Sequence, residues 1–394
     1  MNKKLISITI VFLFLICGIN TLAMKSNISK NDINKYYSEN GLGLLPRTTP
    51  LPESETLTGD TPDSFDWRNV NGEDWTTSIK EQGGCGSCYA FASIAALESI
   101  YKIKILNEPS ADIDLSEQLM VSCGSSCMGR LNIDGCNGAH FEYAFEFMKH
   151  YGSIREECFD YSSSNWIETG QTESCDNKCN DWKDNRIFIG RYNLISQNTE
   201  SIKNALINYG PLTTSMNVYK DFRSKNFDPH YPNEDVWSNN VYYHKEGGFE
   251  GYHVVTIVGY QDDSDIHSGG YWICKNSWGK DWGITKDGEI NNGDDGGWFR
   301  IAYDDFDGDS DECFINYETY YFDDIYESGV IEESKLELVE DEINLGKIEC
   351  GKDYEFSFTV KNTGDLNSEL DWGVYDSPES CGSSWSYKDK DGQE

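Results

Sequence analysis

Apolar residues recur at helical spacing in the stretch that follows Cys88. They fall three positions apart, at Phe91, Ile94, Leu97 and Ile100. Glycines just before Cys88 mark where a helix begins. The pattern therefore predicts a helix from Cys88 to about Lys104, with Cys88 at its N-terminus.

A different pattern, typical of buried strands, follows His253. The run Val254–Val258 is apolar and rich in β-branched residues, and so predicts a buried strand. Nearer the C-terminus, apolar and polar residues alternate at strand period in stretches 336–339 and 354–360, and a turn follows at 361–365. These stretches predict a separate β module over residues 336–394, after an acidic linker over residues 326–335.

The N-terminus has the layout of a secretory signal. Lys3 and Lys4 precede an apolar run that ends at Cys17, and small residues lead up to Ala23. The run is too short to span a bilayer. We therefore expect a signal peptide over residues 1–23, no membrane insertion after its removal, and a secreted, extracellular or cell-surface-associated protein. Residues 24–61 predict a short, loop-like leader that is either a linker or an extended peptide across the site.

Composition changes the range of expected partners. The 32 Lys and Arg against 68 Asp and Glu give a net charge of −36, which disfavours nucleic acid and anionic membranes. Thirteen cysteines become twelve if Cys17 leaves with the signal, and disulfides are their expected use outside the cytoplasm. Spacings such as Cys85-x-x-Cys88 would also suit zinc or redox chemistry, readings that spacing alone leaves open.

The segment from Gln82 to Ser93 reads QGGCGSCYAFAS. It resembles the nucleophile segment of the papain family of cysteine peptidases. Free N–H groups and the positive end of the helix dipole at Cys88 would favour the thiolate, which is the form that attacks a carbonyl carbon. The resemblance thus implies Cys88 as the catalytic nucleophile.

Two further segments match the family's catalytic residues. Of the six histidines, His140, His150, His230, His244 and His267 lack the context of His253, which opens the buried strand as in the family. The later segment WICKNSWGKDWG is similar to the family's Asn-Ser-Trp-Gly segment. By this resemblance Asn276 orients the imidazole of His253, and Trp278 shields their hydrogen bond from water.

The resemblance also implies an oxyanion site. Here the side-chain amide of Gln82, together with the backbone N–H of Cys88, would donate hydrogen bonds to the tetrahedral oxyanion. One such donor typically lowers the barrier by roughly 3 kcal/mol.

The match covers about residues 62–325. It implies an α+β, two-lobed papain-like fold, with a helical lobe that carries Cys88 and a β-rich lobe that carries His253 and Asn276. Residues 336–394 resemble an immunoglobulin-like module. Because about sixty residues are few for such a sandwich, we expect a partial, truncated β-sandwich, whose partner would be a cell surface or another protein. The resemblance implies no cofactor and no metal. Calcium in the acidic loops Asp287–Gly297 and Asp304–Glu312 is a weaker alternative to solvated turns.

By analogy with the family, we expect disulfides Cys85–Cys136, Cys123–Cys175 and Cys158–Cys179. Cys274 is expected to be a buried free thiol, and Cys127 and Cys313 have no assigned role. Gly138 and Ala139 carry over as substrate-binding residues, with a methyl group at Ala139 that could narrow the approach to the backbone. The pocket for the second residue before the scissile bond carries over as His140, Phe141, Ser215, Val254 and, at its base, Glu318.

The predicted function is a secreted cysteine endopeptidase that acts on proteins or peptides through a thiolate–imidazolium pair and an acyl-enzyme. A carboxylate at Glu318 would accept Arg or Lys in the pocket. No paired-histidine occluding loop follows Cys136, which favours endopeptidase over carboxydipeptidase action. Two alternatives are a catalytically idle binding or adhesion protein and another Cys-His acyl transferase, such as a transglutaminase.

Overall fold

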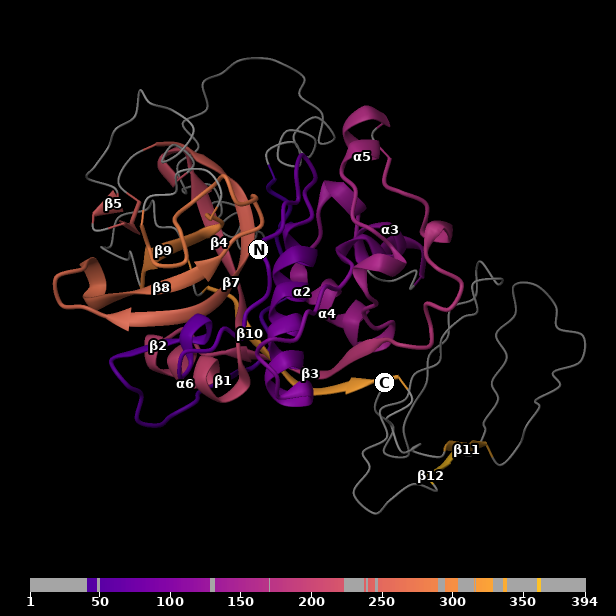
Figure 1. Ribbon diagram of the computed structural model, residues 1–394, viewed down its shortest axis with the longest axis horizontal. Helices are drawn as coiled ribbons and strands as arrows, with labels where there is room; N and C mark the ends of the chain where they lie inside the picture. Colours follow the sequence, from indigo (N-terminus) through magenta and orange to yellow (C-terminus); the bar gives the residue numbers. More distant parts are fainter. Residues whose placement is uncertain are drawn as a thin grey trace, which may run out of the picture. The chain divides into compact units, whose positions relative to one another are not determined.

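The computed structural model describes residues 41–47, 50–127, 132–169, 171–222, 237–238, 240–244, 247–289, 295–303, 315, 317–328, 336–338 and 360–362. The chain divides into two compact units, Met1–Tyr326 and Glu327–Glu394. Figure 1 shows that helices gather in one part of the first unit and strands in the other. This is the α+β, two-lobed arrangement that the sequence predicts.

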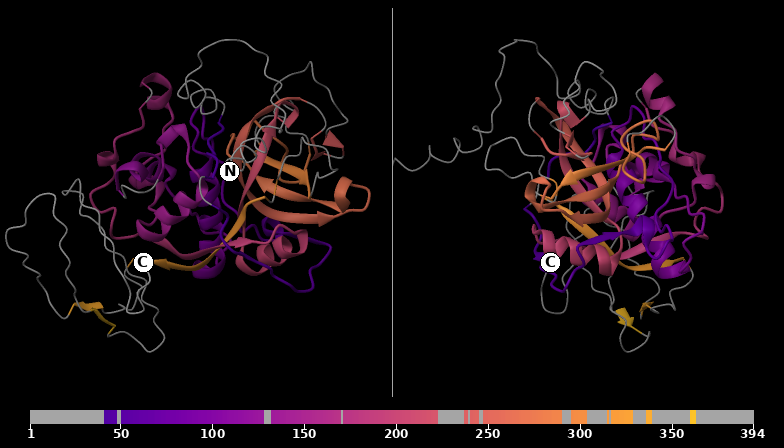
Figure 2. Two further views of the ribbon diagram at one scale, coloured as in Figure 1. Left: turned by 180° about the vertical axis from the view of Figure 1, so that it is seen from behind. Right: turned by 60° about the vertical axis from the view of Figure 1, so that its left-hand side comes forward.

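The helical lobe is built around α2, Cys88–Tyr101. All fourteen residues of α2 are buried, and a π-helical turn, η2 (Lys102–Leu106), extends it. The helix predicted from the apolar spacing is therefore confirmed, although it is buried on every face. The same lobe contains α3 (Glu117–Cys127), α4 (Phe141–His150) and the short α5 (Ser164–Thr169), and Figure 2 shows this helical lobe beside the strands from behind.

The strands form one sheet whose order is β1-β3-β10-β4-β7-β8-β9-β6-β5, with β2 paired to β7. Its longest strand, β7, begins at Phe249, four residues before the predicted start, because its pairing with β4 extends from Ile257 to Phe249. Helix α6 (Thr199–Tyr209) packs in the β-rich lobe, where Trp67 Nε1 donates to Leu206 O at 2.9 Å. The strand bounds are β1 Ser54–Glu55, β2 Ser64–Asp66, β3 Ile187–Ile195, β4 Leu212–Tyr219, β5 Trp237–Ser238, β6 Val241–Tyr242, β7 Phe249–Asp262, β8 Gly270–Lys275, β9 Trp298–Ala302 and β10 Thr319–Glu327.

Helix α2 lies against β7, so the two lobes meet along these elements. Thr256 Oγ1 of β7 donates to Ala92 O of α2 at 3.0 Å, with both groups buried. The contact places the first turn of α2 beside the part of β7 that carries His253.

Three disulfides fix loops of the helical lobe, and they are the pairings that the family resemblance implies: Cys85–Cys136, Cys123–Cys175 and Cys158–Cys179. Among the described cysteines, Cys88 and Cys274 are free and buried. Cys313 lies outside the described residues, as does the side chain of Cys127.

The second unit is described over two short strands. Here β11 (Leu336–Leu338) pairs antiparallel with β12 (Val360–Asn362). The signal peptide, the linker over 329–335, the rest of the predicted immunoglobulin-like module and the acidic loop 304–312 lie outside the described residues. The described residues do not support a β-sandwich, so that module stays a prediction.

In the part of the chain that the structure covers, no helix is both long and apolar enough to cross a bilayer. Within the same residues, no three His, Cys, Asp or Glu side chains gather as a metal site would require.

An aromatic cluster joins α4 to the sheet, and it yields a stability prediction. The fully buried ring of Phe145 lies 5.4 Å from Phe141, 5.3 Å from Tyr320 and 4.9 Å from Phe322. The change Phe145→Ala should therefore lower the free energy of unfolding by about 3–5 kcal/mol, because it leaves a cavity where α4 meets β10. Denaturant titration measures this, with the exposed Tyr317→Ala expected to change stability by less than about 0.5 kcal/mol.

Candidate active site

Cys88 is the first residue of α2, as expected, and its thiol is fully buried. Backbone groups of Val254, Gly43, Tyr89 and Leu44 hydrogen-bond to it. Burial raises the pKa of the thiol to about 11, and these hydrogen bonds, which act in the opposite direction, do not offset it. Burial and these hydrogen bonds thus act on the thiol in opposite directions, and the thiolate expected at the helix N-terminus stays a prediction.

His253 lies on β7 with its ring buried between the lobes. Its Nε2 lies 2.8 Å from Asn276 Oδ1, just beyond the end of β8. The same Oδ1 accepts a hydrogen bond from the backbone N–H of Ser277 at 2.8 Å, which fixes the amide with its oxygen toward the imidazole. The Trp278 ring lies 4.8 Å from the His253 ring. The backbone of Val254, the next residue in the chain, hydrogen-bonds to Cys88, so the part of β7 that carries His253 lies beside the start of α2.

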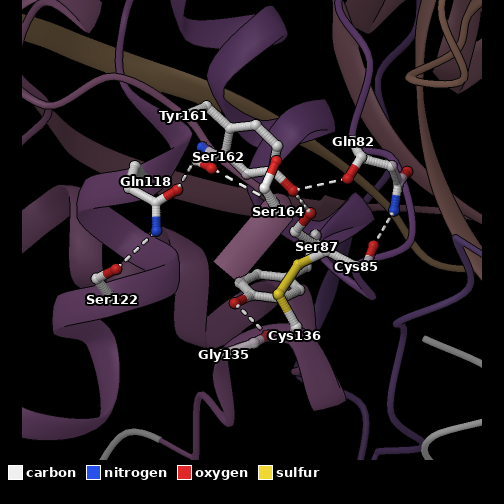
Figure 3. The surroundings of a disulfide bond; sticks show 11 residues. Gln82, Cys85, Ser87, Gln118, Ser122, Gly135, Cys136, Tyr161, Ser162 and Ser164 are labelled. Carbon is white, nitrogen blue, oxygen red and sulfur yellow. Dashed lines mark hydrogen bonds between the residues drawn. A yellow bond between two sulfur atoms is a disulfide. The ribbon is translucent and has the colours of Figure 1, made fainter. Parts of the chain in front are cut away.

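Gln82 is held beside Cys88 by several hydrogen bonds. Its Oε1 accepts from Ser277 Oγ at 2.6 Å, and its Nε2 donates to Cys85 O at 2.7 Å. Figure 3 shows the second of these bonds, together with the Tyr161 hydroxyl that donates to Gln82 O and contacts Ser87. The nearby Cys85–Cys136 disulfide ties this loop to residues 135–137. Because an amide nitrogen has two hydrogens, one remains for a second acceptor.

The residues carried over as a specificity pocket also lie together. Ser215 of β4 pairs with Val254 of β7, and its N–H donates to Glu318 O at 3.1 Å. His140 Nε2 lies 3.4 Å from Glu318 Oε2. Phe141 stacks on His140 with ring centroids 4.8 Å apart. The five residues thus come together from four segments, with His140 at the N-cap of α4, and their role as a pocket stays a prediction.

Part of the leader lies directly over these residues. Ala139 N donates to Gly43 O at 3.0 Å, and Leu45 N donates to Ala139 O at 3.1 Å. On the other lobe, Leu44 N donates to Tyr252 O at 3.4 Å. The leader therefore pairs with the backbone of both lobes, and the methyl group of Ala139 does not prevent a close approach. Of the two readings left open by the sequence, the structure supports the extended peptide.

Gly43 fits this place because it has no side chain. A Cβ at Gly43 would overlap the backbone of Gly86, and a Cβ at Gly138, where φ is +108°, would overlap Gly43 O. Gly43, Gly86 and Gly138 thus allow the backbone of the leader to contact the backbone of the helical lobe next to Cys88. The sequence alone predicted no role for Gly43.

Comparison with known proteins agrees with this arrangement. The family model "Papain family cysteine protease" matches residues 61–322. The chain belongs to the papain family of cysteine proteases. It is 32% identical to a Giardia intestinalis protein named cathepsin B-like CP3, over 64% of this chain and 72% of that one. It is 31% identical to cathepsin B-like CP2 of the same organism, over 66% of this chain and 77% of that one.

Among solved structures, the chain is similar in fold to procathepsin B S9 from Trypanosoma congolense. The TM-score is 0.53 at 21% identity, over 73% of this chain and 89% of that one. At this identity the likeness shows the fold alone. The chain is thus a papain-family cysteine protease, a hydrolase, as the sequence motifs predict.

Lys80 forms a network of ion pairs next to the loop that carries Gln82. Lys80 Nζ contacts Glu98 of α2 at 3.1 Å, Glu117 of α3 at 2.9 Å and Asp114 at 2.7 Å. Lys275, just before Asn276, donates to Thr77 at 2.9 Å, and burial lowers its pKa to about 8. Because Lys80 stands two residues before Gln82, the network ties the oxyanion loop to both helices.

The leader contact gives a prediction about the reactivity of Cys88. The change Gly43→Val should dislodge the leader, because its side chain would overlap Gly86. With the thiol less buried, we expect its pKa to fall and alkylation by iodoacetamide near neutral pH to speed up at least about tenfold. The rate of Cys88 modification against pH, followed by mass spectrometry, measures both effects.

Gly248→Val is the matched control, since nothing lies within 4 Å of a Cβ at that position. It should alkylate as the unchanged chain does. Equal rates in all three proteins would mean that the leader does not limit access to Cys88.

Proposed function

We propose that this cysteine endopeptidase acts through Cys88, His253, Asn276 and Gln82, and that it works outside the cell. The observation that supports it most directly is the His253–Asn276 contact of 2.8 Å, next to a nucleophile at the start of a helix. A structural histidine would need no such amide locked in place by Ser277.

The chemistry follows from these positions. His253 takes the proton of the Cys88 thiol and becomes an imidazolium. The Cys88 thiolate attacks the scissile carbonyl carbon, and the carbonyl oxygen becomes an oxyanion that accepts hydrogen bonds from Cys88 N–H and Gln82 Nε2. The C–N bond breaks as the imidazolium of His253 protonates the departing amine. Water, deprotonated by His253, then attacks the thioester, and the peptide acid leaves with Cys88 restored as thiolate. Asn276 acts by holding the ring in one orientation.

The leader keeps the enzyme at rest in this proposal. Residues 43–45 occupy the backbone positions of Ala139 and Tyr252 that a substrate would need. A protein or peptide substrate binds only when the leader has moved or been cut.

Export is supported by three disulfides, which form and persist in oxidising compartments. The apolar N-terminal run supports it as well. We further propose that residues 336–394 are an immunoglobulin-like module that contacts a cell surface or another protein. The β11–β12 pair is consistent with this assignment. Detection of the full chain in culture medium, with its signal peptide removed, tests export.

The catalytic assignment predicts a graded loss of activity in the Gly43→Val background. There Cys88→Ala and His253→Ala should abolish peptide cleavage, because each removes a reacting group. Gln82→Ala should lower kcat by about 10²–10³-fold, because one oxyanion donor is lost. Steady-state kinetics on a peptide substrate measure the losses.

A thiol-trapping epoxysuccinyl peptide separates the rival functions. Labelling at Cys88 that His253→Ala abolishes supports the protease. Absence of labelling in Gly43→Val, with the chain folded by circular dichroism, would favour an idle binding module. Acyl transfer to an added amine, in preference to water, would favour a transferase.

A further inference from the structure

The side chain of Arg47, in the leader, is held by two carboxylates at once. Its Nη1 lies 2.7 Å from Glu142 Oε2, and its Nη2 lies 2.7 Å from Glu318 Oε2. Its Nε also donates to Glu318 Oε2 at 3.1 Å. The exposed fractions of the three side chains are 11%, 19% and 7%, so these ion pairs are largely shielded from water.

A tyrosine completes the site. Tyr320 OH accepts from Arg47 Nη2 at 2.7 Å and donates to Glu142 Oε1 at 2.8 Å. The phenol thus fixes the Glu142 carboxylate while it contacts the guanidinium. We call the group Glu142, Glu318 and Tyr320 the guanidinium site. Glu142 lies in the first turn of α4, where the helix dipole favours a negative charge.

Charges around this site favour a cation strongly. Burial raises the pKa of the Glu318 carboxyl, but hydrogen bonds and charges from His140 and Arg47 outweigh it and hold that pKa below its usual value. His140 lies beside both acids, 3.4 Å from Glu318 and 3.8 Å from Glu142. An apolar side chain in place of Arg47 would leave two shielded carboxylates without a cation, which is costly.

The arrangement fits arginine better than lysine. The two carboxylates approach from different directions and bind different nitrogens of one planar group. A guanidinium presents five donors in a fixed fork, whereas an ammonium is a compact point charge that cannot take the place of all these nitrogens. Glu318 alone would accept either cation, and Glu142 is the residue that makes the distinction.

We propose that the guanidinium site is an arginine-selective substrate subsite in which Glu142 is the specificity-determining residue, and that the leader fills it in advance with Arg47. The proposal rests on the endopeptidase function and on the family-based assignment of Glu318 to the pocket for the second residue before the scissile bond. It adds a residue, Glu142, and a preference for arginine over lysine that Glu318 by itself does not imply.

The decisive experiment compares three peptides that differ only in that second residue, which is Arg, Lys or Leu. Full-length Gly43→Val protein, with its leader displaced, should cleave the Arg peptide with a kcat/KM at least about tenfold above that of the Lys peptide. Adding Glu142→Gln should lower the ratio of kcat/KM for the Arg peptide to that for the Lys peptide to about one. It should change kcat/KM for the Leu peptide by less than about threefold. Adding Glu318→Gln should reduce cleavage of both basic peptides. The exposed Glu157→Gln is the matched control and should leave all three values unchanged.

The outcomes separate this proposal from the proposed function. Cleavage of the Leu peptide shows that the enzyme is folded and active. If the Arg and Lys peptides are then cleaved equally, or if Glu142→Gln leaves their ratio unchanged, the arginine site is wrong while the endopeptidase stands. If no peptide is cleaved and Cys88 is not labelled, the endopeptidase itself fails.

A second measurement needs no catalysis. In the full chain, Arg47→Lys should speed the alkylation of Cys88 at least about tenfold if the leader depends on the fork of the guanidinium. Arg47→Ala should speed it at least as much. Rates equal to that of the unchanged chain would show that Arg47 does not hold the leader, and would overturn the part of the proposal that concerns the leader.

Discussion

The packing of α2 against β7 is the contact on which the rest of this enzyme depends. One element begins with Cys88 and the other carries His253, and the Thr256–Ala92 hydrogen bond joins them in the interior. Every residue of α2 is buried. The helix therefore cannot shift without opening the cores of both lobes. Catalytic geometry is thus a consequence of core packing, and Asn276 and Gln82 only refine it through their shared partner, Ser277.

Burial has opposite consequences for two groups near this interface. It raises the pKa of the Cys88 thiol because the charged form of the buried sulfur would lose its contact with water. Glu318 is also shielded, yet its pKa is lowered because Arg47 and His140 lie beside it. The same leader thus contacts the Cys88 thiol through the backbone of Gly43 and Leu44, and it contacts Glu318 through the charged side chain of Arg47.

The sequence predicted most of the catalytic site because its signals are local. QGGCGSCYAFAS and KNSWG each combine a reactive residue with the pattern of a helix or a strand. Glu142 carried no such signal, because in the sequence it looks like a solvated residue on a helix. Arg47 carried none either, because it stands 271 positions from Glu318. The burial of the Cys88 thiol carried no local signal either. The helix terminus is visible in the sequence, whereas the contacts of residues 43 and 44 with the thiol are tertiary.

The leader is held by two unlike anchors, and in the proposed resting state their separation would let so short a segment cover the site. Gly43 is fixed by backbone pairing and close contact, and Arg47 by charge. Individually such contacts are modest, about 1 kcal/mol for a neutral hydrogen bond. Because β1 pairs with β3 just beyond Arg47, the leader is tethered at a high effective concentration and need not bind tightly. A cut between Pro50 and Ser54 would remove the high effective concentration while leaving the contacts of Gly43 and Arg47 in place. In this proposal the same weak anchors therefore permit both stable closure and complete release.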